Sequence, residues 1–480
     1  MKKFAKKATQ TAAALVAAVC VAFLFSCEKK ADPKPEQGIP EKEEARTEYL
    51  LNGEDLSDYT IVIPNEPSDF EMWTCEILKD KVYELTGIEL KTAYDSESQR
   101  ELEILIGNTD RAESRLDNME KGKYYLYSKN GSIVLNGEDY FVAGGAGYII
   151  SALEGSDGTA SISVEKEIKG RNIEWKPARN VILFIGDGMG KNHPVLATAP
   201  TPSLQYSQNN VAFPEEEHCQ IFWADTFPYI GEAVTLNYYG STTDSAAGAT
   251  ALATGYKTAN GALGMIPADL DSDGNEDEFC SVQNVREAAA LKGKSTAVLS
   301  TDKKTGATPN GFLVHHTSRY DRDIISQQQE ALDSSRLDYT YFWSRYDNDE
   351  FLIKVQKTID KCNNNDEGFF IMAEEAMIDK YSEKTDFDNV IRTVKRLNSA
   401  VAYTATYAAC CPDTVVILTA DHETGGLTQS DDGIWYWQSD GEHTPLNVPV
   451  YAIGHGCEIF GDATVENTDI AKFIFSLMEN

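Results

Sequence analysis

The stretch NVILFIGDGMG at residues 180–190 runs from five unbroken apolar residues into a glycine-rich turn. An apolar run of this length that ends in turn residues predicts a strand buried on both faces of a sheet. The turn places Asp187 directly beyond the strand, where open α/β sheets gather their ligand-binding groups. This stretch therefore predicts both a buried strand and a functional carboxylate at its end.

The same pattern returns further along the chain. Apolar runs at 296–299, 369–373 and 415–418 each lead into polar residues, and helical stretches such as 282–291 and 388–408 lie between them. Alternating apolar strands and helices predict parallel strands with helices on both faces. We therefore expect residues 178–480 to form an α/β catalytic domain with a mostly parallel central sheet sandwiched by helices.

Acids and histidines stand at the ends of these predicted strands. Glu374 follows one of them, and Asp421 and His422 follow another. Parallel strands end at one edge of a sheet, so these groups would converge with Asp187. Because converging carboxylates and imidazoles would repel or stay unsatisfied without cations, the pattern predicts a polynuclear metal site.

The segment TDSAAGATALATG at residues 243–255 places Ser245 before a run of small helix formers. Its hydroxyl would lie near a helix N-terminus, a position that favours an anionic phosphate and stabilises an oxyanion. The alternative is an ordinary alanine-rich packing helix with a serine N-cap. The segment alone does not decide between the two.

Taken together, these motifs give the chain from about residue 180 to its end a resemblance to the alkaline phosphatases. The segments that carry it, in order, are residues 180–190, 244–246, 257–264, 307–309, 316–319, 374–379, 419–422 and 442–444. The resemblance implies metal-dependent hydrolysis of phosphate monoesters. Ser245 would be the nucleophile that forms a phosphoserine, and Arg319 would hold two phosphate oxygens.

The resemblance also implies three metal sites. It assigns one zinc to Asp187, Asp421 and His422, a second zinc to Asp379, His443 and one further ligand, and a magnesium to Asp187, Thr308 and Glu374. Oxygen ligands suit magnesium, whereas imidazole and carboxylate suit zinc.

One departure from the family falls at Glu383, four residues after Asp379, where the family has the histidine that completes the second zinc site. Three interpretations stay open. Glu383 could bind zinc through oxygen, a local shift could bring another ligand or a water, or the second site could be weak or empty. An added carboxylate would raise the pKa of the bound water and favour harder ions.

Two other places differ from the family or suggest another ion. Gly306 stands where relatives carry Asp or His near the magnesium, so we expect a more open magnesium site with a changed ion preference. The segment 269–275 begins like a calcium loop but has Cys280 at the position of the closing glutamate, so a surface turn is favoured over calcium binding.

The N-terminus predicts export. Lysines precede an apolar run from Ala12 to Phe25, which is typical of a signal peptide at residues 1–26. Leu24-Phe25-Ser26-Cys27 resembles a bacterial lipobox, so Cys27 would carry lipid and residues 27–46 would form an acidic tether. We expect a protein that is lipid-anchored to a bacterial membrane outside the cytoplasm, in the periplasm or at the cell surface; a plain cleaved signal is the alternative.

Residues 47–175 predict a small α+β domain before the catalytic one. A helical pattern covers 69–85, strands are indicated at 59–63 and 103–106, and Asn130-Gly131 joins two strands as a hairpin. The segment contains no histidine and no phosphate-binding loop. An accessory or spacer domain is favoured over a glycan-binding module.

Composition excludes some classes of protein and leaves others open. With 42% hydrophobic residues and a net charge of -33, the chain is neither disordered throughout nor built to bind nucleic acid. Scattered cysteines give no zinc ribbon, and one or two disulfides remain open without a pairing. Two alternatives to a monoesterase are a phosphodiesterase or sulfatase of the same superfamily and a degenerate phosphate- or glycan-binding lipoprotein. A homodimer is also left open.

Overall fold

The computed structural model describes residues 48–156, 158–199, 205–206, 221–268, 278–332, 339–342 and 350–478. Residues from Glu48 onward form one compact unit, and residues 1–47 are outside it. The predicted signal peptide, Cys27, the tether and the calcium-like segment 269–275 therefore lie outside the described residues. Within the described ranges, no helix is long and apolar enough to cross a membrane.

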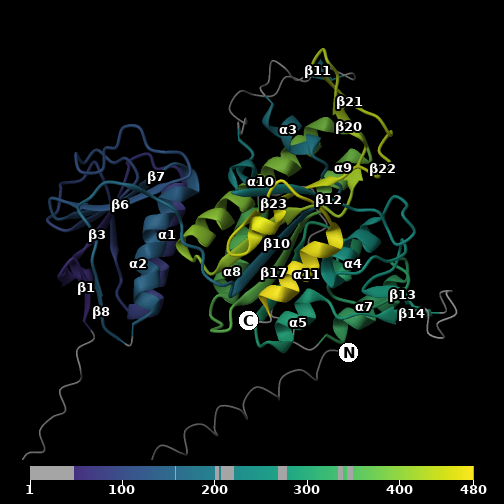
Figure 1. Ribbon diagram of the computed structural model, residues 1–480, viewed down its shortest axis with the longest axis horizontal. Helices are drawn as coiled ribbons and strands as arrows, with labels where there is room; N and C mark the ends of the chain where they lie inside the picture. Colours follow the sequence, from purple (N-terminus) through teal and green to yellow (C-terminus); the bar gives the residue numbers. More distant parts are fainter. Residues whose placement is uncertain are drawn as a thin grey trace, which may run out of the picture. The chain divides into compact units, whose positions relative to one another are not determined.

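An eight-stranded sheet forms the centre of the C-terminal part of the chain (Figure 1). Its strands, in order across the sheet, are β16 (Tyr339–Phe342), β15 (Ser295–Ser300), β17 (Phe369–Glu375), β10 (Asn180–Gly186), β18 (Thr414–Thr419), β23 (Val448–Ile453), β12 (Tyr229–Val234) and β24 (Thr464–Glu466). The first five are parallel to one another, whereas β23 is antiparallel to β18 and β12. The predicted α/β fold with a mostly parallel sheet is confirmed.

The strand register brings the polar strand ends together. Ile185 of β10 lies opposite Glu374 of β17 on one side and Thr419 of β18 on the other. Asp187 lies two residues after Ile185, and Asp421 lies two residues after Thr419. All residues of β10, β15, β17 and β18 are buried, which explains the apolar run at the centre of each strand.

Helices cover both faces of the central sheet (Figure 1). One layer contains α3 (Asn192–Thr198), α8 (Glu350–Cys362), α9 (Met377–Ser382) and α10 (Phe387–Cys410), and the other contains α4 (Ser245–Thr254), α5 (Val285–Leu291), α6 (Ala307–Gly311) and α11 (Asn467–Leu477). A further helix, α7 (Arg322–Glu330), follows the loop that carries Arg319. The helix predicted from residue 282 begins at Val285, because Asn284 forms a capping box with Glu287.

A six-stranded sheet occupies the N-terminal part of the described chain. Its order is β4 (Lys91–Tyr94), β3 (Thr60–Ile63), β5 (Glu103–Ile106), β7 (Ser132–Gly137), β6 (Tyr124–Lys129) and β9 (Gly170–Arg171), with helices α1 (Asp69–Thr86) and α2 (Ala143–Glu154). The predicted hairpin through Asn130-Gly131 is present, with Lys129 opposite Ser132. The boundary of a separate accessory domain near residue 175 stays a prediction.

Helix α2 packs against α10 through a glycine. A Cβ atom placed on Gly147 would lie 2.3 Å from the carbonyl oxygen of Ala409, so only glycine permits this approach. Buried residues of the central sheet and of one face of the six-stranded sheet belong to one continuous hydrophobic cluster, whereas the other face of the six-stranded sheet has a small cluster of its own. The helices of the N-terminal part therefore share a core with the C-terminal part.

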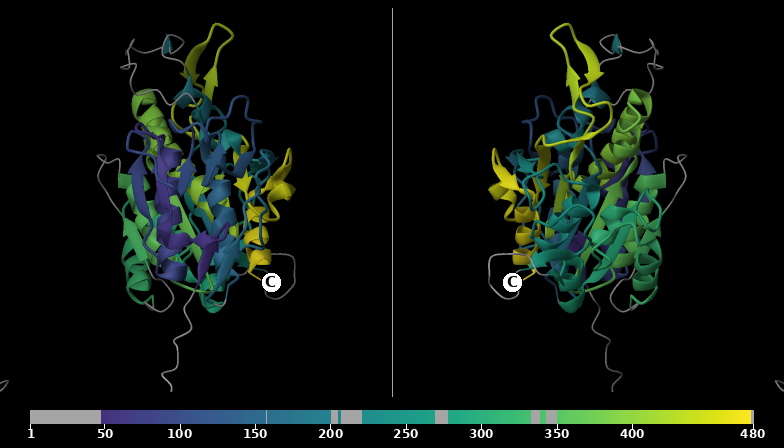
Figure 2. Two further views of the ribbon diagram at one scale, coloured as in Figure 1. Left: turned by 90° about the vertical axis from the view of Figure 1, so that its left-hand side faces the viewer. Right: turned by 90° about the vertical axis from the view of Figure 1, so that its right-hand side faces the viewer.

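Smaller strands complete the described chain. They are β1 (Tyr49–Leu51), β2 (Glu54–Asp55), β8 (Ala160–Ile162), β11 (Gln205–Tyr206), β13 (Met265–Ala268), β14 (Glu278–Ser281), β19 (Glu423–Thr424), β20 (Leu427–Gln429), β21 (Ile434–Trp437) and β22 (His443–Thr444). Figure 2 shows the β20–β21 hairpin in yellow-green at the top of both views. Cys75, Cys280, Cys410, Cys411 and Cys457 are free thiols, and Cys219 lies outside the described residues.

Candidate active site

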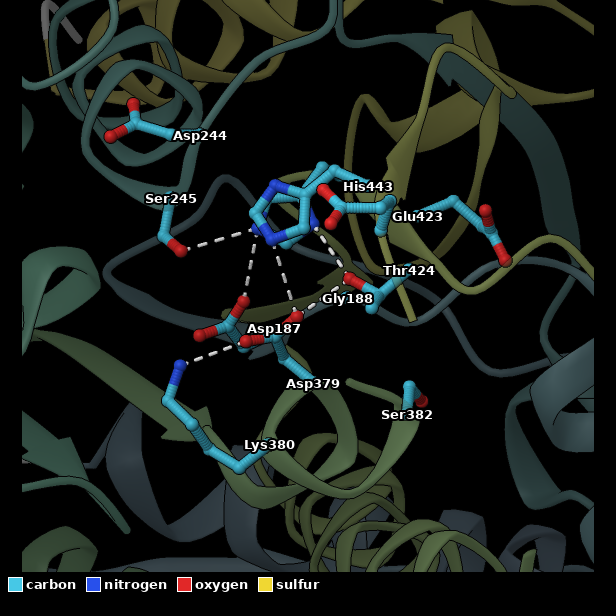
Figure 3. Close-up of polar contacts among 12 residues, drawn as sticks. Asp187, Gly188, Asp244, Ser245, Asp379, Lys380, Ser382, Glu423, Thr424 and His443 are labelled. Carbon is cyan, nitrogen blue, oxygen red and sulfur yellow. Dashed lines mark hydrogen bonds and ion pairs between the residues drawn. The ribbon is translucent and has the colours of Figure 1, made fainter. Parts of the chain in front are cut away.

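The nucleophile candidate stands at the first position of α4. The preceding residue, Asp244, is the N-cap, and its side chain accepts a hydrogen bond from the backbone N–H of Ala247 at 3.0 Å. Ser245 therefore does not cap the helix, so its hydroxyl is free to serve the site. Its Oγ lies 3.2 Å from Nε2 of His422, and the residue is buried (Figure 3).

The first group of candidate metal ligands contains Asp187, Asp421 and His422, whose ligand atoms lie within 4.8 Å of one another. All three residues are buried. Oδ1 of Asp187 has no hydrogen-bond partner, although it lies 3.3 Å from Nε2 of His422. A buried carboxylate oxygen without a partner is costly unless a cation binds it, so this donor set fits a metal ion.

The pKa values of this group fit a site that binds a cation. Burial, with the nearby charges of Asp421 and Asp379, raises the pKa of Asp187 well above its usual value. Burial raises the pKa of Asp421 to about 6, and burial together with His443 lowers the pKa of His422 to about 3. The protein alone thus disfavours the charged forms of these groups, and a dication would reverse the preference for the carboxylates.

The second group contains Asp379 of α9, His422 and His443 of β22 (Figure 3). Nε2 of His443 lies 3.5 Å from Oδ1 of Asp379, and Nδ1 of His443 lies 3.0 Å from the carbonyl oxygen of Thr243. The rings of His422 and His443 are stacked with their centroids 3.7 Å apart. Thr424 donates a hydrogen bond to Oδ1 of Asp379 at 2.6 Å and thereby orients it.

Oxygen ligands gather beside the first group. Ser300 donates a hydrogen bond to Glu374, and the hydroxyl of Thr308 lies 3.5 Å from Oδ2 of Asp421. Burial and the charge of Asp302 raise the pKa of Glu374 to about 8. These hydroxyl and carboxylate oxygens are the donors that magnesium prefers.

The position of Gly306 is less open than the sequence suggests. A Cβ atom placed on Gly306 would lie 2.7 Å from Oδ2 of Asp302. The carboxylate of Asp302 therefore fills the space that a side chain at residue 306 would need. Sequence reasoning missed Asp302, because nothing in its spacing to the motif indicates that it folds back onto Gly306.

Glu383 is a predicted ligand that the structure does not place within either group of candidate metal ligands. It follows the last residue of α9, its side chain is exposed, and it belongs to neither group of candidate ligands. The buried His193 of α3 contacts the last residue of this helix, with Nε2 3.1 Å from the hydroxyl of Ser382. Nδ1 of His193 accepts a hydrogen bond from the backbone N–H of Gly190, and burial lowers the pKa of this histidine to about 4.

Two cationic side chains border the candidate ligands. Arg319 donates a hydrogen bond from Nη1 to Oδ2 of Asp244 at 3.1 Å, and its side chain is 23% exposed. Lys380 donates to Oδ2 of Asp379 at 2.8 Å. The helix N-terminus, Arg319 and Lys380 together give the site a region that favours an anion.

Comparison with known proteins places these observations in a family. The family model described as "Alkaline phosphatase" matches residues 178–345 and 350–441. Alkaline phosphatase 3 of Bacillus subtilis (strain 168) is 26% identical over 65% of this chain and 72% of its own length. Alkaline phosphatase 4 of the same organism is 28% identical over 55% of this chain and 65% of its own length.

The fold is also similar to solved structures. The alkaline phosphatase from the Antarctic bacterium TAB5 superposes with a TM-score of 0.52 at 22% sequence identity. The match covers 63% of this chain and 99% of that one. At 22% sequence identity, this similarity shows a shared fold and no more.

Proposed function

This chain belongs to the alkaline phosphatase family, and we propose that it hydrolyses phosphate monoesters through a phosphoserine formed on Ser245. The observation that carries the proposal is the position of Ser245. Its hydroxyl lies at a helix N-terminus, 3.2 Å from His422, beside two groups of candidate metal ligands. No packing role requires a buried serine hydroxyl there, because Asp244 already caps the helix.

The candidate ligands fit the three ions that the family resemblance implies. Asp187, Asp421 and His422 would hold one zinc, Asp379 and His443 would hold a second, and Asp187, Thr308 and Glu374 would hold magnesium. When bound, these ions supply Lewis acidity that lowers the pKa of the serine hydroxyl and of the attacking water. The third ligand of the second zinc is not assigned, so Glu383, a shifted ligand or a water, and a weak or empty site all stay as alternatives.

The protein's own groups position the phosphate. Arg319 presents its guanidinium beside Asp244, which fixes the planar group so that it can donate to two phosphate oxygens. The backbone N–H groups at the start of α4 favour the negative charge that develops as the bond forms. The Ser245 hydroxyl gives up its proton to solvent, and Oγ forms a bond to phosphorus while the ester P–O bond breaks. The departing alkoxide takes a proton from water.

Hydrolysis of the phosphoserine completes the cycle. Water attacks phosphorus, the P–Oγ bond breaks, and inorganic phosphate leaves as Ser245 recovers its hydroxyl. Lys380 lies beside Asp379 and can reach phosphate through a bridging water. Both steps displace one oxygen from phosphorus. Arg319 and the backbone N–H groups at the start of α4 can therefore hold the phosphate in both.

The test is turnover of p-nitrophenyl phosphate with zinc and magnesium added, compared with Ser245→Ala. We expect loss of the serine to lower kcat by at least about a thousandfold, because the nucleophile is removed. Ser399→Ala is the matched control, since Ser399 is exposed on α10. Brief incubation with phosphate at acidic pH should leave one phosphate on the parent protein and none on Ser245→Ala, measured by intact mass.

The same assay separates the alternatives. Faster turnover of bis-p-nitrophenyl phosphate or p-nitrophenyl sulfate than of the monoester would favour the diesterase or the sulfatase. Binding of phosphate without any turnover between pH 7 and 10.5 would favour the degenerate binding protein. The exposed side chain of Glu383 supports this last alternative, because an exposed glutamate would leave the second zinc site incomplete.

A further inference from the structure

Three tyrosines are exposed on the loops that carry Asp244 and Arg319. The side chains of Tyr238, Tyr239 and Tyr320 are 47%, 60% and 77% exposed. A single exposed aromatic residue is common on protein surfaces, whereas several on the loops of one site indicate a binding surface. The proposed chemistry on phosphorus uses none of the three.

One short segment, residues 258–261, connects both loops. The backbone N–H of Tyr238 donates to the carbonyl oxygen of Thr258 at 2.9 Å, and that of Arg319 donates to Gly261 at 2.7 Å. Gly261 in turn donates from its N–H to both carboxylate oxygens of Asp244, each at 3.1 Å. Residues 258–261 therefore join the two tyrosine loops and the N-cap Asp244 in one hydrogen-bonded network, which we call the frame.

The buried side chain of Asn237 makes this frame rigid. Its Oδ1 accepts hydrogen bonds from the N–H groups of Tyr239 and Ser241, both at 3.0 Å. Its Nδ2 donates to the side chain of Asn260 at 3.0 Å. The rings of Tyr238 and Tyr239 pack edge to face with centroids 5.3 Å apart, so the exposed rings stand on fixed backbone.

Tyr320 follows Arg319 directly in the chain. Burial lowers the pKa of Arg319, but the carboxylates of Asp244 and Asp187 hold it above its usual value. A phosphate bound to this guanidinium would have the phenol of the adjacent Tyr320 nearby. The neutral phenols also do not repel a phosphate dianion, unlike the acidic residues that dominate a chain of net charge -33.

We propose that Tyr238, Tyr239 and Tyr320 bind the leaving group, and that preferred substrates are monoesters whose leaving group carries a flat aromatic ring, such as nucleoside 5′-monophosphates. The inference rests on the proposed function and names its substrate class. With the phosphate held at Ser245 and Arg319, the base would extend outward over the tyrosine loops and stack on the exposed rings of the three tyrosines. Such stacking tolerates different bases, because every base presents a π-face.

The test compares AMP with ribose 5-phosphate, which is the same primary ester without the base. In the parent protein we expect kcat/KM for AMP to exceed that for ribose 5-phosphate by about tenfold or more. Tyr320→Ala and Tyr239→Ala should each reduce this ratio several-fold. Tyr320→Phe should keep it, because the ring that stacks is retained.

Tyr83→Ala is the matched control, since Tyr83 is 61% exposed on α1 and belongs to neither loop. Equal kcat/KM values for the two esters in the parent protein would overturn the inference while leaving monoester hydrolysis intact. If neither ester were hydrolysed, the proposed function would fail, and calorimetric Kd values for AMP and ribose 5-phosphate on the Ser245→Ala protein would still decide the inference. Equal Kd values there would refute it.

Discussion

At the scale of a single residue, Glu383 bears on how tightly the second zinc is bound. Its backbone N–H donates to the carbonyl oxygen of Asp379 at 2.8 Å, so residue 383 continues the turn of α9 and lies on the same side of it as Asp379. A histidine at this position would add an imidazole to the group of Asp379 and His443. Glu383→His should therefore bind the second zinc more tightly, by about tenfold or more.

Calorimetric titration of zinc into metal-free protein measures this change, with kcat/KM at low zinc as a second readout. Lys384→His is the matched control, because residue 384 is also exposed but stands one position further round the turn. Unchanged zinc binding by Glu383→His would mean that the native glutamate, or a shifted ligand, already completes the site.

How far the site could be predicted also varies residue by residue. Asp187, Asp421 and His422 follow buried strands and Glu374 lies near the end of another, so their convergence could be expected from the parallel sheet. Asp302 could not, because it meets Gly306 only through the local path of a loop. The exposure of Glu383 likewise depends on where α9 ends, which spacing alone does not give.

At the scale of an element, α4 is positioned by a glycine. A Cβ atom placed on Gly248 would lie 2.6 Å from the carbonyl oxygen of Asp421. The helix that begins at Ser245 therefore approaches the backbone of a candidate ligand more closely than any side chain allows. Because both partners are backbone, an added methyl group must shift α4 and Ser245 with it.

Gly248→Ala should lower kcat/KM by about ten- to hundredfold, since displacement of a nucleophile by a fraction of an ångström is costly for the reaction. The change is measured together with the melting temperature, so that misplacement is separated from unfolding. Gly155→Ala is the control, because a Cβ there would meet only Ser151 O at an ordinary 3.8 Å. Full activity of Gly248→Ala would show that α4 tolerates a shift.

Element prediction succeeded where the pattern was long or strongly marked. The helices at α1 and α10 and the strands β10 and β18 lie within a few residues of their predicted bounds, because their apolar spacing extends over the whole element. The antiparallel placement of β23 between β18 and β12 could not be read from any of these strands. Its sequence is apolar in either direction, and long-range pairing decides its orientation.

At the scale of the whole molecule, the buried acids couple metal binding to stability and pH. A carboxyl group with a raised pKa holds its proton more tightly in the folded state, so the stability it contributes at low pH is lost as the pH rises through the raised pKa. Burial raises the pKa of Asp421 from 3.8 to about 6 and that of Glu374 from 4.5 to about 8. The metal-free protein should therefore lose stability from about pH 4 to about pH 8.

Bound cations remove this loss, because they stabilise the same carboxylates in the ionised form. The melting temperature of the zinc- and magnesium-loaded protein should thus exceed that of the chelated protein by an amount that grows between pH 5 and pH 8. Calorimetry on both forms across this range measures the difference, and reloading the chelated sample is the control for irreversible damage. A difference that stays constant or shrinks with rising pH would show that the raised pKa values of Asp421 and Glu374 do not govern metal-linked stability, since ionisation of these acids must destabilise only the form without cations.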